Sequence, residues 1–308
     1  MPYAPSGRQF ELRLASRVAD QTATIVEVGG GIRAYRVGDR DVLHPYPIDA
    51  MCDGAHGAPL IPWPNRLGDG RYRFDGVDYQ VSLTEPEKRN ALHGFLRWRT
   101  WEPMTRTDSR IVLGTRHYPQ QGYPFALDVR IEYALSDGGL TVATTATNIG
   151  DAACPYACGQ HPYLSPGSGL VDDGVLELSA GTRIVTDPQR QLPTGTEAVS
   201  GSAYDFRTAR RIGDQPIDFA FDDLDRDADG LAWVNLTGAD GRTARLWVDA
   251  SYPLVEIYTA DTLAPDRRRC GLGVEPMTCP PNGLQSGDRV IRLEPGDTVT
   301  TRWGATLA

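Results

Sequence analysis

The chain has 308 residues, and its 31 lysine and arginine residues are outnumbered by 40 aspartate and glutamate residues, which gives a net charge of −9 and a pI near 5.1. This acidic balance argues against a nucleic-acid partner, because binding to phosphates requires a basic surface. The length suits one large all-β domain or two smaller domains. Because no linker rich in Ser, Pro or Gly and no repeat of fixed period divides the chain, we expect a single domain over residues 1–308.

Targeting and redox signals are weak. The residues after Met1 lack a basic region followed by an apolar run, so no signal peptide is expected. No stretch of about 18 apolar residues is present, which argues against a membrane span. The five cysteines are scattered, and Cys154 and Cys158 have no second pair at zinc-ligand spacing. We therefore expect reduced thiols, no bound metal and a cytoplasmic protein.

The hydrophobic pattern predicts strands almost throughout. Residues 71–74 alternate, turn at Asp75-Gly76 and resume over residues 77–81, which indicates a hairpin because Asp-Gly readily takes the positive φ angles of a tight turn. Residues 125–135 carry an apolar side chain at every second position, and a turn at residues 137–139 leads into a second alternating run. The runs 231–236, 244–248 and 254–258 repeat the pattern late in the chain.

Helical signals are almost absent. We find no helix-period segment longer than two turns, and 33 Gly and 23 Pro residues break the chain into short runs. Residues 207–229 are polar and are expected to form a long loop over one end of the sheets. The predicted fold class is therefore all-β, a large antiparallel sandwich or barrel-like stack.

Short segments far apart in the chain carry the residues best suited to chemistry. They offer an arginine, two histidines and two carboxylates, and their members are Asn65-Arg66, His93, His161, Asp218 and Glu275. Such a set suits proton transfer on an uncharged, polyhydroxylated substrate. No helix or loop could bring these residues together locally, so only the tertiary fold could assemble them.

The arginine and the two histidines each have a structural alternative. Arg66 lies in an irregular Pro- and Gly-rich segment and offers a planar fork of donors to sugar hydroxyls, although it could equally bridge two loops. His93 precedes Gly94, which could let a ligand approach the backbone closely, although His93 could also be a hydrogen-bonded structural histidine. Pro162 restricts His161 to an extended conformation, and a rigid histidine suits either a proton donor or a buried core residue.

The carboxylates differ in how clearly the sequence marks them. Glu275 follows an apolar stretch and precedes a Pro-rich one, so we expect it to end a strand beside a cleft. Its alternative role is an ion pair with an arginine such as Arg66. Asp218 lies in the polar segment, where Asp222 and Asp223 are equally plausible by composition.

Together these segments resemble the aldose 1-epimerase (galactose mutarotase) family from about Asn65 to Asn282. The matching motifs, in order, are Asn65-Arg66, Phe74-Asp-Gly-Val-Asp-Tyr79, Asn90-Ala-Leu-His93-Gly94 with Trp101 downstream, His161-Pro-Tyr163 and Val274-Glu275-Pro-Met-Thr-Cys-Pro-Pro-Asn282. Each motif alone is weak, but all of them in this order and at these spacings are highly specific.

The resemblance implies a large antiparallel β-supersandwich with an open cleft, and catalysis without a cofactor or metal. It matches Glu275 to the catalytic base that takes the C1 hydroxyl proton and His161 to the general acid that protonates the ring oxygen. It matches His93 to a second histidine close to the sugar ring.

The resemblance also suggests how the substrate is held. Arg66, next to Asn65, matches a substrate-binding arginine, and Asp218 matches an acidic binding residue. The chain departs from the family's pattern after His93, where the connection to Trp101 is short, and after Tyr163. Both segments would border the cleft, so they bear on the preferred sugar more than on the reaction.

Three rival functions remain at this point. An epimerase of a phosphorylated hexose would use arginines such as Arg97 and Arg99, next to His93, to meet the phosphate. A carbohydrate-binding domain would hold a sugar without turning it over. A glycosidase is disfavoured, because it needs two carboxylates flanking the bond and only Glu275 has a strong claim. The predicted partner is a small sugar, and the oligomeric state is left open.

Overall fold

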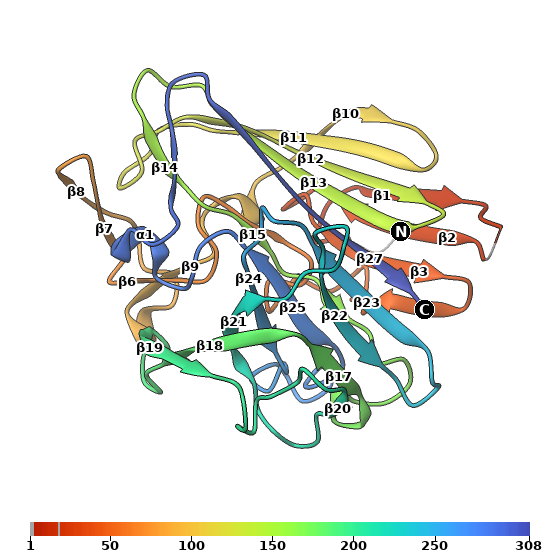
Figure 1. The fold of residues 1–308 in the computed structure, drawn as a ribbon. Coiled ribbons are helices and arrows are strands. Elements are labelled where there is room, and N and C mark those ends of the chain that lie inside the picture. The colour runs from red at the N-terminus through yellow and green to blue at the C-terminus, as the bar shows by residue number, and fades with distance from the viewer. Residues whose placement is uncertain (1–2, 18) are drawn as a thin grey trace.

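A computed structural model describes residues 3–17 and 19–308. Two large antiparallel sheets dominate it (Figure 1). The larger sheet has the order β1 (Gln9–Leu14), β2 (Gln21–Val26), β3 (Ile32–Val37), β4 (Arg40–Leu43), β16 (Tyr163–Leu164), β25 (Leu272–Met277), β24 (Leu254–Tyr258), β21 (Asp218–Leu224), β18 (Ala180–Thr186) and β19 (Pro193–Ala198), and β15 (Gly159–Gln160) joins β25 to β5 (Pro59–Leu60). The second has the order β10 (Glu102–Arg106), β11 (Arg110–His117), β12 (Leu127–Ser136), β13 (Gly139–Asn148), β27 (Thr298–Leu307), β23 (Thr243–Val248), β22 (Ala232–Thr237), β17 (Val175–Leu178) and β20 (Arg210–Arg211). The predicted all-β antiparallel fold is confirmed.

The remaining elements are short. They are the pairs β6 (Arg66–Gly68) with β9 (Asn90–Leu92), β7 (Arg71–Phe74) with β8 (Val77–Gln80) and β14 (Cys154–Tyr156) with β26 (Ile291–Leu293), the 3-10 turns η1 (Pro86–Lys88), η2 (Leu96–Trp98) and η3 (Val171–Asp173), and the helix α1 (Gly283–Ser286). No helix in the described part of the chain has the length and apolar character needed to cross a membrane.

Strand periodicity in the sequence corresponds closely to the observed strands. Phe74 lies opposite Val77 across the predicted Asp75-Gly76 turn, and β12 and β13 pair over their full lengths. The prediction of one long loop over residues 207–229 was wrong, because it contains β20 and the seven-residue strand β21. Aspartates at both ends of β21 masked its core, Phe219, Ala220 and Phe221, which is buried between β18 and β24.

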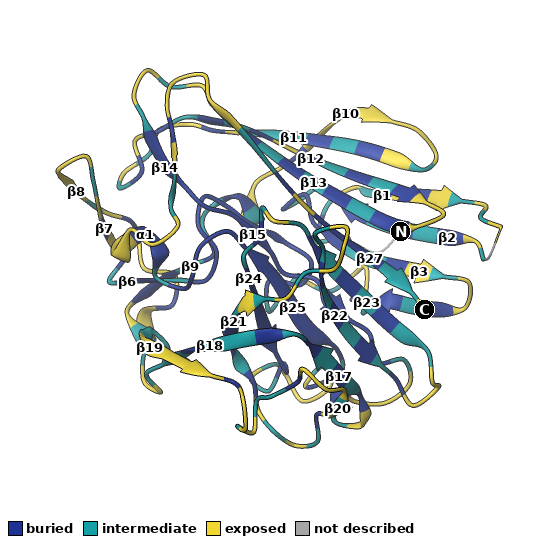
Figure 2. Ribbon diagram, viewed as in Figure 1, coloured by how far each residue is buried: buried dark blue, intermediate teal, exposed yellow. Residues whose placement is uncertain are grey.

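The two sheets pack face to face. Strand β4 of the larger sheet contacts β23 and β27 of the second, and β1 contacts β12. The inward side chains of β12 alternate with outward ones and are fully buried, as the dark bands in Figure 2 indicate. The core thus forms where period-2 patterns on both sheets face each other.

Gln160 connects the two layers with hydrogen bonds that a buried amide needs. Its Oε1 accepts a hydrogen bond from Trp303 Nε1 at 3.1 Å, and its Nε2 donates to Tyr133 Oη at 2.9 Å. Both partners lie on the second sheet, while Gln160 belongs to β15 of the larger sheet. The backbone that leads into His161 is therefore fixed by the sandwich core.

A smaller group of elements closes one end of the sandwich. The pair β6–β9, the hairpin β7–β8 and helix α1 lie together at the left of Figure 1, away from both chain termini. The Gly68 N–H donates to Asn282 Oδ1 at 2.9 Å, which ties β6 to the start of α1. This cap places Arg66 and His93 over the middle strands of the larger sheet.

Candidate active site

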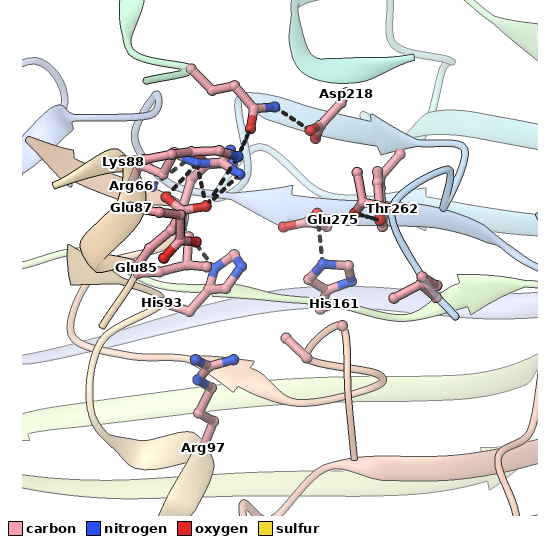
Figure 3. Close-up of a pocket in the computed structure, with 17 residues that line it drawn as sticks. Arg66, Glu85, Glu87, Lys88, His93, Arg97, His161, Asp218, Thr262 and Glu275 are labelled. Atoms are coloured by element: carbon pink, nitrogen blue, oxygen red, sulfur yellow. Dashed lines mark hydrogen bonds and ion pairs between the residues drawn. The ribbon is translucent and has the colours of Figure 1, made fainter. Parts of the chain in front are cut away.

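A cavity of about 380 Å³ opens beside the middle strands of the larger sheet (Figure 3). It contains all six of the site residues predicted from the sequence, which are Asn65, Arg66, His93, His161, Asp218 and Glu275. They come from β6 and the residue before it, the end of β9, the segment between β15 and β16, β21 and β25. The fold therefore brings together residues that lie up to about 210 positions apart in the sequence.

Glu275 and His161 form the centre of this site. Glu275 Oε1 lies 3.0 Å from His161 Nε2, and both side chains are almost fully buried. The expectation that Glu275 ends a strand was wrong, because it is the fourth of six residues in β25. Its partner is also a histidine, and not the Arg66 considered as an alternative. An acid and a base are thus already in direct contact.

The segment around His161 is held by its neighbours. Its N–H donates to the Ala58 carbonyl at 3.0 Å, and its own carbonyl accepts from the Gly57 N–H at 2.8 Å. The imidazole stacks on Tyr163, with ring centres 5.0 Å apart, and Tyr163 stacks in turn with His56 at 4.2 Å. Burial lowers the pKa of His56 to about 3, so this second ring is neutral and packs as an aromatic. The sequence did not reveal this role of His56.

His93 is fixed by a reciprocal pair of hydrogen bonds with Asn65. The His93 N–H donates to the Asn65 carbonyl at 3.0 Å, and the Asn65 N–H donates to His93 Nδ1 at 3.1 Å. Both residues have positive φ, and Gly94 must follow, because a Cβ there would lie 2.0 Å from the Ile61 carbonyl oxygen. With Nδ1 accepting, the neutral ring carries its proton on Nε2.

The electrostatic surroundings keep His93 neutral. Burial, followed by the nearby His161, Arg97 and Arg66, lowers the pKa of His93 well below its usual 6.5. A neutral imidazole with a fixed Nε2–H is a hydrogen-bond donor and a poor proton donor.

Arg66 is oriented by Glu85. Its Nε donates to Glu85 Oε2 at 3.0 Å and its Nη2 donates to Glu85 Oε1 at 3.1 Å, a two-point contact that fixes the guanidinium plane. Glu85 is itself held by Asn90 Nδ2 at 2.9 Å and Lys88 Nζ at 3.2 Å. Burial is the largest influence and opposes the charge on Arg66, but the hydrogen bonds that it donates to Glu85, together with the nearby charges of Asp218, Glu85 and Glu256, raise the arginine's pKa. Glu85 was not identified from the sequence.

Among the three aspartates considered, only Asp218 lines the cavity. It begins β21, and its Oδ2 accepts a hydrogen bond from Gln191 Nε2. Asp222 forms an ion pair with Arg289, and Asp223 accepts from Thr182 Oγ1 at 2.9 Å. Burial raises the pKa of Asp218 above its usual value, which makes it a strong acceptor for a hydroxyl group.

A buried acid that the sequence analysis missed lies next to Glu275. Glu256 on β24 is the direct cross-strand partner of Glu275 on β25, and it is only 2% exposed. Its Oε2, like Glu275 Oε2, has no hydrogen-bond partner among the described residues. Burial, then the charges of Glu275 and Asp218, raise the pKa of Glu256 well above 4.5. Its signal was an acid inside the apolar run 254–258, the same signal that marked Glu275.

His93, His161 and Glu275 could also be considered as metal ligands, because their donor atoms all lie within 4.8 Å of one another. The hydrogen bonds fit this role poorly. His93 Nδ1 already accepts the Asn65 N–H, so the nitrogen left for a metal carries a proton, and His161 Nε2 already contacts Glu275. The donors are arranged for proton transfer and hydrogen bonding.

Comparison with known proteins agrees with this geometry. The family model described as Aldose 1-epimerase matches residues 13–304, nearly the whole chain. The chain belongs to the aldose 1-epimerase family. The members of this family are isomerases, and the resemblance inferred from the motifs is confirmed.

Sequence relatives support the same assignment, and a solved structure shares the fold. An uncharacterized protein of Escherichia coli, YihR, is 33% identical over 284 residues, covering 90% of this chain and 87% of that protein. The aldose 1-epimerase of Escherichia coli is 25% identical over 274 residues, covering 83% and 78%. The aldose epimerase homologue of C. elegans has a TM-score of 0.86 at 18% identity and covers 98% of this chain and 99% of that one.

Proposed function

We propose that the protein is an aldose 1-epimerase that interconverts the α and β anomers of a free aldohexose, such as glucose or galactose. Membership of the aldose 1-epimerase family supports the reaction class. The observation that carries the proposal is the buried contact of 3.0 Å between Glu275 Oε1 and His161 Nε2 at the cavity. The reduced state of the five cysteines fits a cytoplasmic enzyme.

Mutarotation requires a base and an acid that lie close together. The C1 hydroxyl and the ring oxygen are bonded to the same carbon, so the groups that exchange protons with them must be neighbours. In the proposed step Glu275, as carboxylate, takes the proton of the C1 hydroxyl, while His161, as imidazolium, gives a proton to the ring oxygen. The C1–ring oxygen bond breaks and leaves an open-chain aldehyde.

The reverse proton transfers close the ring. The aldehyde rotates about C1–C2, the C5 hydroxyl oxygen attacks the other face of C1, and His161 takes back the hydroxyl proton while Glu275 returns its proton to the new C1 oxygen. Atoms and charge balance over the cycle, and neither cofactor nor metal enters it. Each positioned acid or base typically contributes about 10²–10⁴ in rate.

The remaining residues hold the sugar. Neutral His93 donates a hydrogen bond from Nε2 to a sugar oxygen. Arg66 donates to the sugar from the N–H groups that do not bind Glu85, and Asp218 accepts a hydrogen bond from a sugar hydroxyl. Asn65 lines the cavity and faces the substrate. Its side chain also shapes the cavity wall, because Asn65 Oδ1 accepts a hydrogen bond from the Arg66 backbone N–H at 2.8 Å.

Polarimetry tests the proposal directly. Freshly dissolved α-D-glucose and α-D-galactose are followed with the wild-type protein and with Glu275→Gln. Wild type is expected to accelerate the decay of optical rotation, and the variant to lose most of that acceleration because an amide cannot take the proton. Saturable sugar binding without acceleration would instead favour a non-catalytic carbohydrate-binding protein.

A further inference from the structure

One charged group in the cavity has no role in the proposed proton transfers. Arg97, in the turn η2, lines the same cavity as Glu275 and His161. In Figure 3 its guanidinium points toward His93 from the side away from Arg66 and Asp218. Arg97 is also one of the charges that lower the pKa of His93.

The Arg97 guanidinium has no carboxylate partner among the described residues. Within the described part of the chain no ion pair or side-chain hydrogen bond involves it, and its guanidinium carbon lies 5.2 Å from the ring centre of its neighbour Trp98. Burial lowers the pKa of Arg97, and the nearby Cys52 thiol supplies no counter-charge at neutral pH, because burial raises its own pKa to about 11. A largely desolvated cation without a counter-ion is costly in a folded protein.

Three other guanidinium groups with little exposed surface have carboxylate partners. Arg40 pairs with Asp240 at 2.8 Å, and Arg66 pairs with Glu85 at 3.0 Å. Arg269 likewise contacts two aspartates at 2.7 Å. Arg97 differs from these three in that it lines the cavity, where a ligand can neutralise it.

The charges of the cavity are divided between two ends. Arg97 lies apart from the other charged side chains of the cavity, which are on the opposite side of neutral His93 and include the cations Arg66 and Lys88 as well as the carboxylates (Figure 3). We propose that Arg97 binds an oxyanion carried by the substrate, so that the preferred sugar is an acidic aldose. The group is a carboxylate, sulfonate or phosphate on the exocyclic C6, because guanidinium forks match such oxygens.

This inference rests on the proposed function and narrows its substrate class. A neutral hexose fills the same site but leaves Arg97 unneutralised, so it is exchanged less efficiently. Arg99, two residues later, offers a matched control: it is exposed, donates to Gln120 Oε1 at 3.3 Å and does not line the cavity.

Anomer exchange measured by NMR, with the enzyme-free rate subtracted, tests the inference. The substrates are glucose, glucuronate, glucose 6-phosphate and the 6-sulfonate of glucose, so that the arms separate the three oxyanions. We expect wild-type kcat/KM for at least one acidic sugar to exceed that for glucose by about tenfold or more, the effect of one charge-assisted contact. Arg97→Leu should lower this ratio by about tenfold or more, and Arg97→Lys should restore part of it.

The control outcomes separate the two proposals. Arg99→Leu should leave the ratio of acidic to neutral sugar unchanged, and thermal unfolding of Arg97→Leu checks that the fold is retained. A wild type that prefers glucose, or an Arg97→Leu variant with an unchanged ratio, overturns the oxyanion site while mutarotation stands. A wild type that exchanges none of the four sugars overturns the proposed function itself.

Discussion

At the scale of single residues, the decisive contact is the one between Glu275 and His161. In the proposed mechanism they act on two oxygens of one carbon, so they should behave as a unit. We expect Glu275→Gln and His161→Gln each to lower kcat by about 10²–10⁴. The double variant should lose less than about tenfold beyond the worse single variant, as for other residues that act together. Polarimetric rates of the three variants measure this coupling, and fully multiplicative losses would show independent roles.

Glu256 leads to a prediction about pH and stability. Its pKa in the folded protein is raised well above 4.5, so the folded state holds a proton that the unfolded chain releases. The stability that this proton contributes is complete below the unfolded pKa and is lost as the pH rises through the folded pKa. Glutamine at this position does not titrate.

The unfolding free energy of Glu256→Gln, relative to wild type, is therefore expected to increase between about pH 4 and about pH 8. Urea unfolding of both proteins at a series of pH values measures the difference. Two stability curves that stay parallel over this range would show that Glu256 is ionised in the folded protein.

At the scale of elements, the short connection from β9 to η2 places His93. Gly94 has φ +64°, and a Cβ there would lie 2.0 Å from the Ile61 carbonyl oxygen. The backbone that follows β9 therefore packs against the backbone of Ile61 without room for a side chain at position 94. Gly94→Ala is expected to destabilise the protein by about 2 kcal/mol or more and to lower kcat by displacing His93.

Gly76 is the matched control for that substitution. It also has positive φ, +78°, but nothing lies within 4 Å of the position of a Cβ. Gly76→Ala should therefore show only the backbone strain, about 1 kcal/mol, with unchanged activity. Chemical denaturation measures the stability of the two variants, and polarimetry measures their activity. Equal losses in the two variants would show that positive φ alone causes the effect.

At the scale of the whole molecule, Gln160 links the two sheets directly before His161. Gln160→Leu would leave Trp303 Nε1 and Tyr133 Oη buried without this partner, and each such loss typically costs about 1–3 kcal/mol. We expect a clear fall in the urea midpoint. Thr145→Ala is the control, because its hydroxyl pairs with Thr300 within one sheet and is only part-buried. Equal midpoints for the two variants would contradict a bridging role.

The fold was largely predictable because period-2 alternation is a local property. The turn at Asp75-Gly76 and the alternating strand β12 illustrate this, since neither needs information from elsewhere in the chain. The prediction of a loop over residues 207–229 failed because the polar signal of a few aspartates outweighed the apolar signal of a buried three-residue core. Sheet order was beyond local patterns, as β4 pairs with β16 from more than 100 residues later.

The candidate site was predicted by its motifs, and its geometry was not. The order of the motifs identified Glu275 and His161, but their direct contact depends on β15, β16 and β25 meeting in one sheet. Glu256 and Glu85 act through cross-strand and cap contacts that no spacing in the sequence reveals. Likewise, the sequence suggested Arg97 and Arg99 equally as anion-binding residues, and only their different burial in the structure distinguishes them.

The hydrogen bond between Gly68 N and Asn282 Oδ1 joins residues 214 positions apart, and it closes the cap that positions Arg66. A nascent chain leaving the ribosome therefore cannot complete this site until almost its last strand has emerged. Contacts of such long range form late, because the loop they close must be ordered first. In a refolding experiment, recovery of enzymatic activity is expected to lag behind recovery of β-sheet circular dichroism, so turnover would report the final step of folding.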